Sequence, residues 1–492
     1  MKEYLLKCGA SIPQNNKHAV SVSLPTVDDV IGYEEKRPFT IARILSGYPR
    51  FVRHPFVKET IHYLQKKYSQ KGNHAILPGI NTFKEIINKF SLRPKFTAVE
   101  DDIYLLELPK NRAKSAEILS FIQHTGCIVS SRRAEDFLLK NGLVSGIQSE
   151  NSEKNQPEEK IKKVFSSIYK IDSKDIFISA SGMNAVYSAF SAINKTSIKK
   201  NTWIQLGWLY VDNIELLKKY SGNAINIPDV NDFDSLERAI KANKNKIAGI
   251  ITEIPTNPLL KFSNLQKLAS IKNKYNIPLI LDISLASSYS VDVLEYSDVT
   301  IESLTKFACG KADVMLGAII MNPKSRYNEL IKNNLPDFIV KPYIRDMERL
   351  AHEIKNYSGR MKKISSNSEI LADFFSKNKN IQKLHYSNSE STSDNFKLIR
   401  RNKNYNLGII TIETKKPINK FYDNLELLKG PSFGTEFTLN MLYMYLAHYD
   451  MVSSLKGKKL LKSAGINPEL VRISVGTENP DDLIKEYEKA LK

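Results

Sequence analysis

The sequence predicts an α/β protein in which a mostly parallel sheet is covered by helices. The first observation is that short apolar runs alternate with helical patterns between residues 146 and 325. The second is that the runs are continuously apolar, as in DIFISAS (175–181), IAGIITEI (247–254) and IPLILDIS (277–284), which is typical of strands buried on both faces. The third is that amphipathic patterns such as NLQKLASIKNKY follow these runs. Together they indicate a doubly wound layer.

A polar passage divides the chain. Residues 145–162, SGIQSENSEKNQPEEKIK, have the composition of a linker or a surface loop that enters a helix. We therefore predict an N-terminal extension region at 1–145 and a large α/β domain at 146–325. A long helical stretch and then a mixed region follow, which predict a smaller α+β C-terminal domain at 326–492.

The N-terminal region contains both strand-like and helical patterns. Strands are predicted at 19–25 (AVSVSLP) and 102–109 (DIYLLELP). Helices are predicted at 55–68 (PFVKETIHYLQKKY) and 113–123 (AKSAEILSFIQ). Nothing in these patterns states what the region does.

The composition is that of a folded chain. With 492 residues and 42% hydrophobic content, two or three domains with substantial cores are expected. No run of eighteen apolar residues exists, and the N-terminus MKEYLLKCGASIPQ lacks the pattern of a signal peptide. Neither a membrane span nor secretion is indicated, so a cytoplasmic location is expected.

The net charge of +19 raises the question of nucleic-acid binding, because clustered cations release counterions from phosphate backbones. Only 16 of the 72 basic residues are arginine, however, and the lysines are scattered among Asn, Ser and Glu. No helix-turn-helix, zinc-finger or RNA-recognition pattern is present. The sequence therefore disfavours nucleic acid as a partner.

Three cysteines, Cys8, Cys127 and Cys309, lie far apart without CxxC or Cys/His ligand spacing. This argues against a disulfide framework and against a metal site. Cys309 lies three residues from Lys306, so it is either a nucleophile or a small residue that fills a tight turn.

The segment SASGMNAVYSAF (179–190) is the first of four that suggest a ligand site. It leads from a strand through Ser181, Gly182 and Met183 into a helix, whose free N–H groups and macrodipole favour an anion. The second segment, TEIPTNPLL, places Asn257 at the end of a strand, where open α/β sheets bind ligands. Either segment alone also fits an ordinary turn.

Two charged residues complete the pattern. Asp282 ends an otherwise apolar strand, where a cationic ring nitrogen would compensate a buried carboxylate. Lys306, in IESLTKFACG, follows the next strand between Thr305 and Phe307, with Ser303 upstream. Burial there would lower the pKa of the amine and make it a nucleophile toward an aldehyde. An anion site, a carboxylate for a ring nitrogen and such an amine together indicate binding of pyridoxal 5'-phosphate (PLP).

The run from SASGM to SLTKFACGKADVMLGAIIMNP resembles the Cys/Met-metabolism family of PLP enzymes, and the likeness continues in LVRISVGTENPDDLIKEYEKAL (470–491). Three other segments, HAVSVSLPTVDDVIGYEEKRP, QHTGCIVSSRRAED and LLKGPSFGTEFTLNMLYMYLAHY, are similar to fungal-type cystathionine γ-synthases with a long N-terminal extension. The resemblance covers nearly the whole chain. It implies fold type I, the aspartate-aminotransferase-like fold of PLP transferases.

The resemblance also implies a role for individual residues. Lys306 would bind PLP as a Schiff base and then move protons, and Asp282 would keep the ring nitrogen protonated. Tyr210, in GWLYVDN, would stack on the ring and assist proton transfer or departure of the leaving group. Arg472, in LVRIS, would bind the substrate α-carboxylate through its two-pronged guanidinium. The other implied contacts are Ser181, Gly182, Met183, Ser303 and Thr305 to the phosphate, and Asn257 and Ser432 near a cofactor oxygen and the same carboxylate.

Two departures from the family pattern stand out. The usual Asp-Asn-Thr is Asp282-Ile283-Ser284, which predicts the loss of a hydrogen bond beside the pyridine edge. The usual Tyr-x-Arg pair, which reaches the phosphate of a neighbouring subunit, has only partial matches. These are Tyr48 and Arg50 in GYPRF, and Arg132 in SSRRAED, which lacks the tyrosine. The resemblance further implies a homodimer or homotetramer, with the N-terminal region covering the site or contributing to subunit contacts.

The function expected is γ-substitution, in which an O-acylated or O-phosphorylated homoserine loses its γ-substituent and the thiol of cysteine adds to give cystathionine. A γ-lyase, an O-acylhomoserine sulfhydrylase or substitution by another nucleophile stay open, because the acceptor pocket is formed by loops outside the four segments. A non-catalytic nucleic-acid-binding or regulatory protein on the same fold is the alternative from another class. The joint presence of Lys306, Asp282, Tyr210 and Arg472 argues against it.

Overall fold

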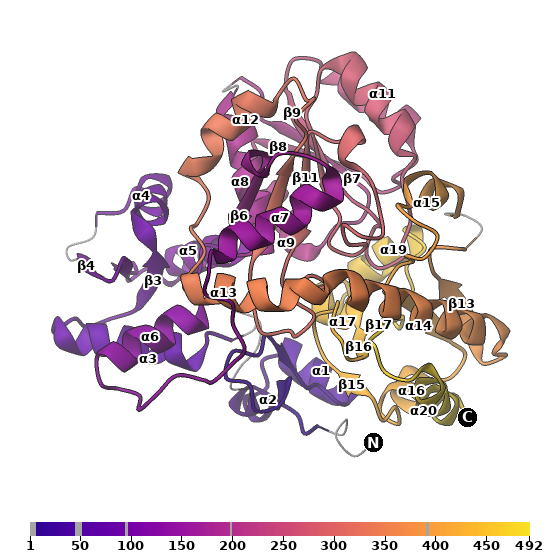
Figure 1. Cartoon of the computed structure of the whole chain (residues 1–492), viewed down its shortest axis with the longest axis horizontal. Helices are drawn as coiled ribbons and strands as arrows, with labels where there is room; N and C mark the ends of the chain where they lie inside the picture. Colours follow the sequence, from indigo (N-terminus) through magenta and orange to yellow (C-terminus); the bar gives the residue numbers. More distant parts are fainter. Residues whose placement is uncertain (1–5, 45–51, 94–96, 197–198, 390–392) are drawn as a thin grey trace.

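A seven-stranded sheet forms the centre of the computed structural model, which describes residues 6–44, 52–93, 97–196, 199–389 and 393–492 (Figure 1). Its strand order is β6-β12-β11-β10-β9-β7-β8. The strands are β6 (Ile176–Ser179), β7 (Thr202–Leu206), β8 (Asn223–Ile227), β9 (Ile247–Glu253), β10 (Leu279–Asp282), β11 (Val299–Ser303) and β12 (Gly317–Met321). Only β12 runs antiparallel to its neighbours β11 and β6. The predicted mostly parallel α/β sheet is confirmed.

Helices cover both faces of this sheet because alternate residues of each strand point to opposite sides. Ile250 and Leu281 belong to one hydrophobic cluster, whereas their neighbours Ile251 and Ile280 belong to another. The first cluster includes residues of α7 (Pro157–Tyr169), α10 (Phe233–Ala242) and α11 (Leu265–Tyr275). The second includes residues of α8 (Gly182–Thr196), α9 (Val211–Tyr220) and α12 (Asn328–Asn334). Burial on both faces explains why the strands lack polar alternation.

The C-terminal part forms a second sheet with the order β13-β14-β17-β16-β15. Its strands are β13 (Ile381–His385), β14 (Ile409–Thr414), β15 (Leu428–Lys429), β16 (Leu439–Leu442) and β17 (Val471–Ser474). The long predicted helix is two helices, α13 (Ile344–Glu353) and α14 (Tyr357–Lys377), separated by a short 3-10 turn. The remaining helices are α15 (Ser393–Ile399), α16 (Ile418–Tyr422), α17 (Tyr443–Ala447), α18 (Tyr449–Ser453), α19 (Leu455–Ser463) and α20 (Pro480–Leu491).

The first described residues, from Leu6 onward, pack against this C-terminal sheet. The short strands β1 (Ser11–Ile12) and β2 (Ser21–Val22) pair with each other, and α1 (Val27–Glu34) and α2 (Pro38–Arg43) follow. Ile12 shares a small hydrophobic cluster with Leu428 and Leu439. Of the strand predicted at 19–25, only Ser21 and Val22 form a strand, and they pair with the neighbouring strand β1.

The rest of the N-terminal region packs against the large sheet through α8. It contains α3 (Pro55–Lys67), β3 (His74–Pro78), α4 (Gly79–Lys89), β4 (Thr97–Glu100), β5 (Ile103–Glu107), α5 (Arg112–Thr125) and α6 (Ser131–Lys140). The three strands form an antiparallel sheet of order β3-β5-β4. Phe121 of α5 meets Tyr187 of α8 edge to face, with ring centroids 5.6 Å apart. The proposed domain boundaries stay a prediction, since the N-terminal region shares cores with both later parts.

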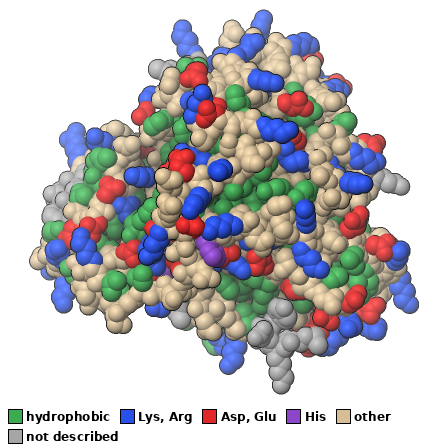
Figure 2. Space-filling model, in the orientation of Figure 1, with side chains coloured by type: hydrophobic (Ala, Val, Ile, Leu, Met, Phe, Trp, Pro, Cys, Tyr) green, Lys and Arg blue, Asp and Glu red, His purple; other side chains and the backbone are tan. Residues whose placement is uncertain are grey.

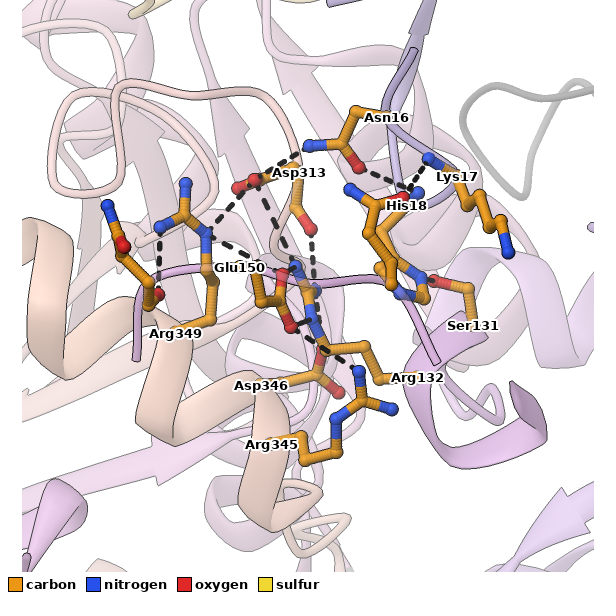
Figure 3. Close-up of polar contacts among 12 residues, drawn as sticks. Asn16, Lys17, His18, Ser131, Arg132, Glu150, Asp313, Arg345, Asp346 and Arg349 are labelled. Atoms are coloured by element: carbon orange, nitrogen blue, oxygen red, sulfur yellow. Dashed lines mark hydrogen bonds and ion pairs between the residues drawn. The ribbon is translucent and has the colours of Figure 1, made fainter. Parts of the chain in front are cut away.

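The polar passage before α7 is held in place by a buried ion-pair network, and it is not a free linker (Figure 3). Arg132 of α6 donates two hydrogen bonds to Glu150 of this passage, at 2.6 and 2.7 Å. Its guanidinium also donates to Asp346 of α13 at 3.0 Å and to the carbonyl oxygen of Asp313 at 2.7 Å. Arg132 therefore joins the N-terminal region to the other two parts.

Basic and acidic side chains are interspersed on the face of the molecule shown in Figure 2 and do not gather in one basic patch. This distribution agrees with the interpretation of the net charge as many solvated lysines. Within the described ranges, the helices are all too short or too polar to cross a bilayer.

We predict that Arg132→Met lowers the free energy of unfolding by about 3–5 kcal/mol, because it leaves buried carboxylates without their cation. The measurement is urea denaturation followed by circular dichroism. Arg37→Met is the matched control, since Arg37 also binds two carboxylates, Asp28 and Glu35, but its side chain is 42% exposed. The control should change stability by less than about 1 kcal/mol. Equal effects of the two substitutions would contradict the assignment.

Candidate active site

A cavity of about 110 Å³ lies where β9, β10 and β11 end, at the edge of the sheet where open α/β folds bind ligands. Most of the residues predicted to form the site line it, namely Ser181, Gly182, Met183, Tyr210, Asn257, Asp282, Ser303, Thr305 and Lys306. Arg472 and Ser432 contact these residues from the C-terminal sheet and its loops. The structure therefore brings together segments that are far apart in the sequence.

Lys306 is 8% exposed and lies just beyond the end of β11. Its Nζ donates a hydrogen bond of 2.9 Å to the Oγ of Ser432 and lies 4.7 Å from the ring centre of Phe433. Gly434 lets this loop approach, because a Cβ at Gly434 would lie 2.6 Å from the backbone nitrogen of Phe307. The amine is thus held in a closed, partly aromatic environment.

Ser432 connects this lysine to Arg472. Its Oγ accepts from Lys306, and its carbonyl oxygen accepts from the Nη2 of Arg472 at 3.0 Å. Ser432 has φ = 94°, which is a strained conformation for a residue with a side chain. Such strain is typical of positions that are fixed by their surroundings at functional sites.

Arg472 of β17 is 3% exposed, yet it forms no ion pair within the part of the chain that the structure describes. Its other hydrogen bonds go to the neutral Oδ1 of Asn257 at 3.3 Å and to the sulfur of Met441 at 3.1 Å. Burial lowers its pKa to about 10, so it stays charged at neutral pH. A buried cation of this kind requires an anion, and a guanidinium binds a carboxylate with two parallel hydrogen bonds.

Two carboxyl groups face each other across neighbouring strands. Asp282 of β10 is the register partner of Glu253, the last residue of β9. Glu253 is 3% exposed and accepts hydrogen bonds from the N–H of Tyr210 at 2.5 Å and from the Nδ2 of Asn213 at 2.9 Å. Burial, with Asp282 adding to the effect, raises the pKa of Glu253. Burial raises the pKa of Asp282 as well, so both carboxyls of the pair are shifted toward the neutral form.

The segment at the start of α8 forms a narrow cradle. The N–H groups of Gly182 and Met183 donate to no acceptor among the described residues, and they lie at the positive end of the helix. A Cβ at Gly182 would lie 2.8 Å from the Cβ of Ser303, so only glycine leaves this space open. The cradle fits the phosphate of a ligand.

Some predicted residues lie elsewhere. Tyr48 and Arg50 lie outside the described residues, so their phosphate role stays a prediction, as does the homodimer or homotetramer. The guanidinium of Arg132 is occupied by Glu150, Asp346 and the Asp313 carbonyl oxygen, which does not favour a role for it at a phosphate. Cys309 is fully buried and burial raises its pKa to about 12, so it fills the turn and is not a thiolate nucleophile.

At the Asp282-Ile283-Ser284 departure, Ser284 forms hydrogen bonds around the carboxylate; the predicted loss of a hydrogen bond beside the pyridine edge stays a prediction. The backbone N–H of Ser284 donates to Asp282 at 2.9 Å, and the Oγ of Ser284 accepts from the N–H of Ser303 at 2.8 Å. Ser284 therefore orients the carboxylate and ties β10 to β11. These contacts were absent from the sequence prediction.

Sequence reasoning also missed Glu253, Asn213 and Phe433. Glu253 precedes the IPTNP motif at a strand end, so the argument applied to Asp282 would have identified it. Asn213 lies in the first turn of α9 and contacts both carboxyls, and Phe433 lies against Lys306 and Arg472. No sequence pattern marks these last two, because their positions depend on packing between distant segments.

The fold and the site define an enzyme of the class that uses an aldehyde cofactor with a phosphate and a ring nitrogen. A family model described as "Cys/Met metabolism PLP-dependent enzyme" matches residues 150–492. The chain belongs to this family, and it is a PLP-dependent enzyme.

Full-length relatives come from bacteria and fungi. The chain is 32% identical over 479 residues to an L-2-amino-4-chloropent-4-enoate dechlorinase/desaturase of Streptantibioticus cattleyicolor, with 96% of each chain covered. It is 25% identical to a cystathionine γ-synthase of Neurospora crassa, with 98% of each covered. Among solved structures, the cystathionine γ-synthase of Xanthomonas oryzae pv. oryzae has a TM-score of 0.58 at 18% identity, covering 69% of this chain and 86% of that chain. This last likeness shows the fold.

Three features of the cavity fit PLP. The cradle at Gly182 and Met183 would hold the phosphate, together with the hydroxyls of Ser303 and Thr305. Asp282 would pair with the ring nitrogen, whose positive charge would stabilise the buried carboxylate. The Oδ1 of Asn213, beside Asp282, is buried and accepts no hydrogen bond from the described residues, as expected where a donor group belongs.

We predict that Gly182→Ala weakens PLP binding by on the order of tenfold or more, because the new methyl group fills the cradle against Ser303. The measurement is titration of the cofactor-free protein with PLP, followed by visible absorbance. Gly146→Ala is the control, since a Cβ there would meet nothing within 4 Å and the residue has no positive φ. Unchanged affinity in Gly182→Ala would show that the phosphate binds elsewhere.

Proposed function

We propose that this enzyme removes a leaving group from Cγ of an L-α-amino acid and replaces it with the thiol of cysteine, as in cystathionine formation. The observation that carries the proposal is the connection of Lys306 and Arg472 through one residue, Ser432. A substrate whose carboxylate lies on Arg472 would have its Cα and Cβ near a single amine. An O-acylated or O-phosphorylated homoserine is the proposed donor.

Lys306 and Tyr210 have separate proposed roles in the reaction. PLP, once bound, supplies an electron sink that makes the Cα–H and then the Cβ–H of the amino acid acidic. Lys306 takes up the proton from Cα, releases it again from Nζ, and then takes up the proton from Cβ, as its position beside the cavity and its flexible stem allow. Tyr210, at the start of α9, lies on the cavity wall and is proposed to assist departure of the γ-substituent.

The surrounding residues orient these groups and exclude water. Arg472 fixes the carboxylate with two parallel hydrogen bonds, which sets the direction of the Cα–H bond. Asp282 stays ionised toward the ring, with the backbone N–H of Ser284 holding one of its oxygens. Phe433 covers Lys306 and Arg472, which strengthens their electrostatic interactions by keeping water away.

γ-Elimination without an acceptor is the second candidate. It is favoured by the 32% identity to the dechlorinase/desaturase, which extends over 96% of both chains. Both reactions share the proton transfers at Cα and Cβ and the loss of the γ-substituent. They differ only in whether a nucleophile then adds to the substrate.

The experiment is to incubate PLP-loaded enzyme with O-acetyl-, O-succinyl- or O-phosphohomoserine, and with 2-amino-4-chloropent-4-enoate, each with and without cysteine. Release of the leaving group coupled to loss of cysteine and formation of a thioether supports substitution. Release of the acyl group, phosphate or chloride without consumption of cysteine supports elimination. Lys306→Ala should lower either rate at least about a hundredfold, because the proton-transfer group is lost. If none of the donors loses its γ-substituent, the proposal fails.

We predict that Arg472→Lys lowers kcat/KM for the donor about 10- to 100-fold, because a lysine cannot form the two parallel hydrogen bonds. The loss should lie mainly in KM, and the visible absorbance of bound PLP should be unchanged. Arg238→Lys, on the exposed face of α10, is the control and should behave as the parent does. An unchanged KM in Arg472→Lys would place the carboxylate on another residue.

A further inference from the structure

A second cavity of about 230 Å³ adjoins the candidate active site. We call it the N-terminal chamber, and it is lined by residues of 18–20, 53–61, 75–76 and 119–131, together with Met315. Three residues, Gln123, Ile128 and Met315, line both this chamber and the cavity that contains Lys306. The two spaces therefore share a wall, formed on the chamber side by the region whose role the sequence left open.

The walls of the chamber are mostly apolar, with Val20, Val57, Ile76 and Val129 among the lining residues. Its two histidines are already engaged. His18 contacts Ser131 at 2.9 Å and Glu135 at 3.1 Å through its two ring nitrogens. A small organic molecule fits such a space better than a free ion does.

His54 is held in the neutral form and does not supply a charge. Its Nε2 lies 2.8 Å from the carbonyl oxygen of Lys17, and its Nδ1 accepts from the N–H of Phe56 at 3.2 Å. Burial lowers its pKa to about 4. His54 therefore adds no positive charge to the chamber wall.

Arg53 places a positive charge on the wall of the chamber. It makes one long hydrogen bond, 3.5 Å from Nη1 to the carbonyl oxygen of His74, and no ion pair with any described residue. The nearest undescribed stretch in sequence, 45–51 (LSGYPRF), contains no acidic residue. The first turn of α3 begins two residues later at Pro55, so the positive end of a 13-residue helix lies beside it. A half-buried guanidinium in this position favours an anionic ligand.

We propose that the N-terminal chamber binds the second, nucleophilic substrate and that Arg53 binds the carboxylate of that molecule. This inference rests on the proposed γ-substitution, whose acceptor it locates. Arg472 would hold the donor carboxylate from the C-terminal sheet, and Arg53 would hold the acceptor carboxylate from the N-terminal region. The class of ligand is a small thiol with a carboxylate, such as cysteine.

The chemistry balances without a further reagent. The donor's leaving group departs with the electron pair of the broken Cγ–X bond. The acceptor sulfur then forms the new S–C bond at Cγ, and the proton of its thiol is released. No oxidant or reductant is needed, and the chamber supplies only orientation and binding.

The first test compares Arg53→Met and Arg53→Lys with the parent, using cysteine and cysteamine as acceptors. Cysteamine carries the same thiol without the carboxylate. Arg53→Met should raise the KM for cysteine about 10- to 100-fold, because a charge-assisted hydrogen bond is lost. It should leave the KM for cysteamine and the bound PLP unchanged, with Arg53→Lys intermediate. An unchanged KM for cysteine would overturn the proposal.

The second test does not depend on turnover. Calorimetry would measure binding of 3-(methylthio)propanoate, which has the carboxylate but no amine to react with PLP, to PLP-loaded parent and variants. Arg53→Met should bind it at least about tenfold more weakly. Arg112→Met is the matched control, because Arg112 is an exposed arginine of the same region that does not line the chamber, and it should bind as the parent does.

The two tests separate failure of this inference from failure of the proposed function. Equal binding of 3-(methylthio)propanoate by parent and Arg53→Met would overturn the acceptor site even if the donor reacts. Weaker binding in Arg53→Met together with no reaction of any donor would support the carboxylate site at Arg53 and overturn the proposed γ-substitution.

Discussion

The site depends on the burial of two carboxyl groups next to each other on neighbouring parallel strands. Asp282 and Glu253 are register partners at the ends of β10 and β9. Two like charges at this distance in a closed cavity cannot both be ionised without a cation, so burial raises the pKa of both groups. The hydrogen bonds that Asn213, Ser284 and the backbone of Tyr210 donate are arranged around this pair. A cationic ring beside Asp282 would stabilise its carboxylate and so relieve the repulsion between the two groups.

Two charged residues of the site could be predicted from the sequence because each lies at or just after the end of an apolar strand. Asp282 and Lys306 each follow an apolar run, and parallel strands bring such ends to one edge of the sheet. Arg472 was identified only through the resemblance of the last segment to the family. Its lack of an ion pair within the described residues depends on how β17 packs, which the local pattern does not encode.

The parts that sequence reasoning missed are those that need contacts over long distances. Ser432 has φ = 94° and forms hydrogen bonds with both Lys306 and Arg472, and no local motif predicts this conformation. The strand β12 is antiparallel and lies between β6 and β11, a position that the order of strands along the chain does not predict. The polarity of the passage at 145–162 predicts a linker or a surface loop that enters a helix, and the passage does enter α7. One of its polar residues, Glu150, instead binds Arg132 in a buried network.

The N-terminal region is the part that distinguishes this chain from its family model. The model matches residues 150–492, whereas all the lining residues of the N-terminal chamber except Met315 precede residue 150. The full-length relatives match 96–98% of this chain, so a region of this kind is shared by a dechlorinase/desaturase and by a cystathionine γ-synthase. Elimination and substitution begin with the same proton transfers, and they diverge only when a nucleophile is held near Cγ. The feature that decides between them should therefore lie outside the shared catalytic residues. Arg53 meets that requirement, because it forms no ion pair with a described residue and lines a chamber that shares lining residues with the lysine cavity.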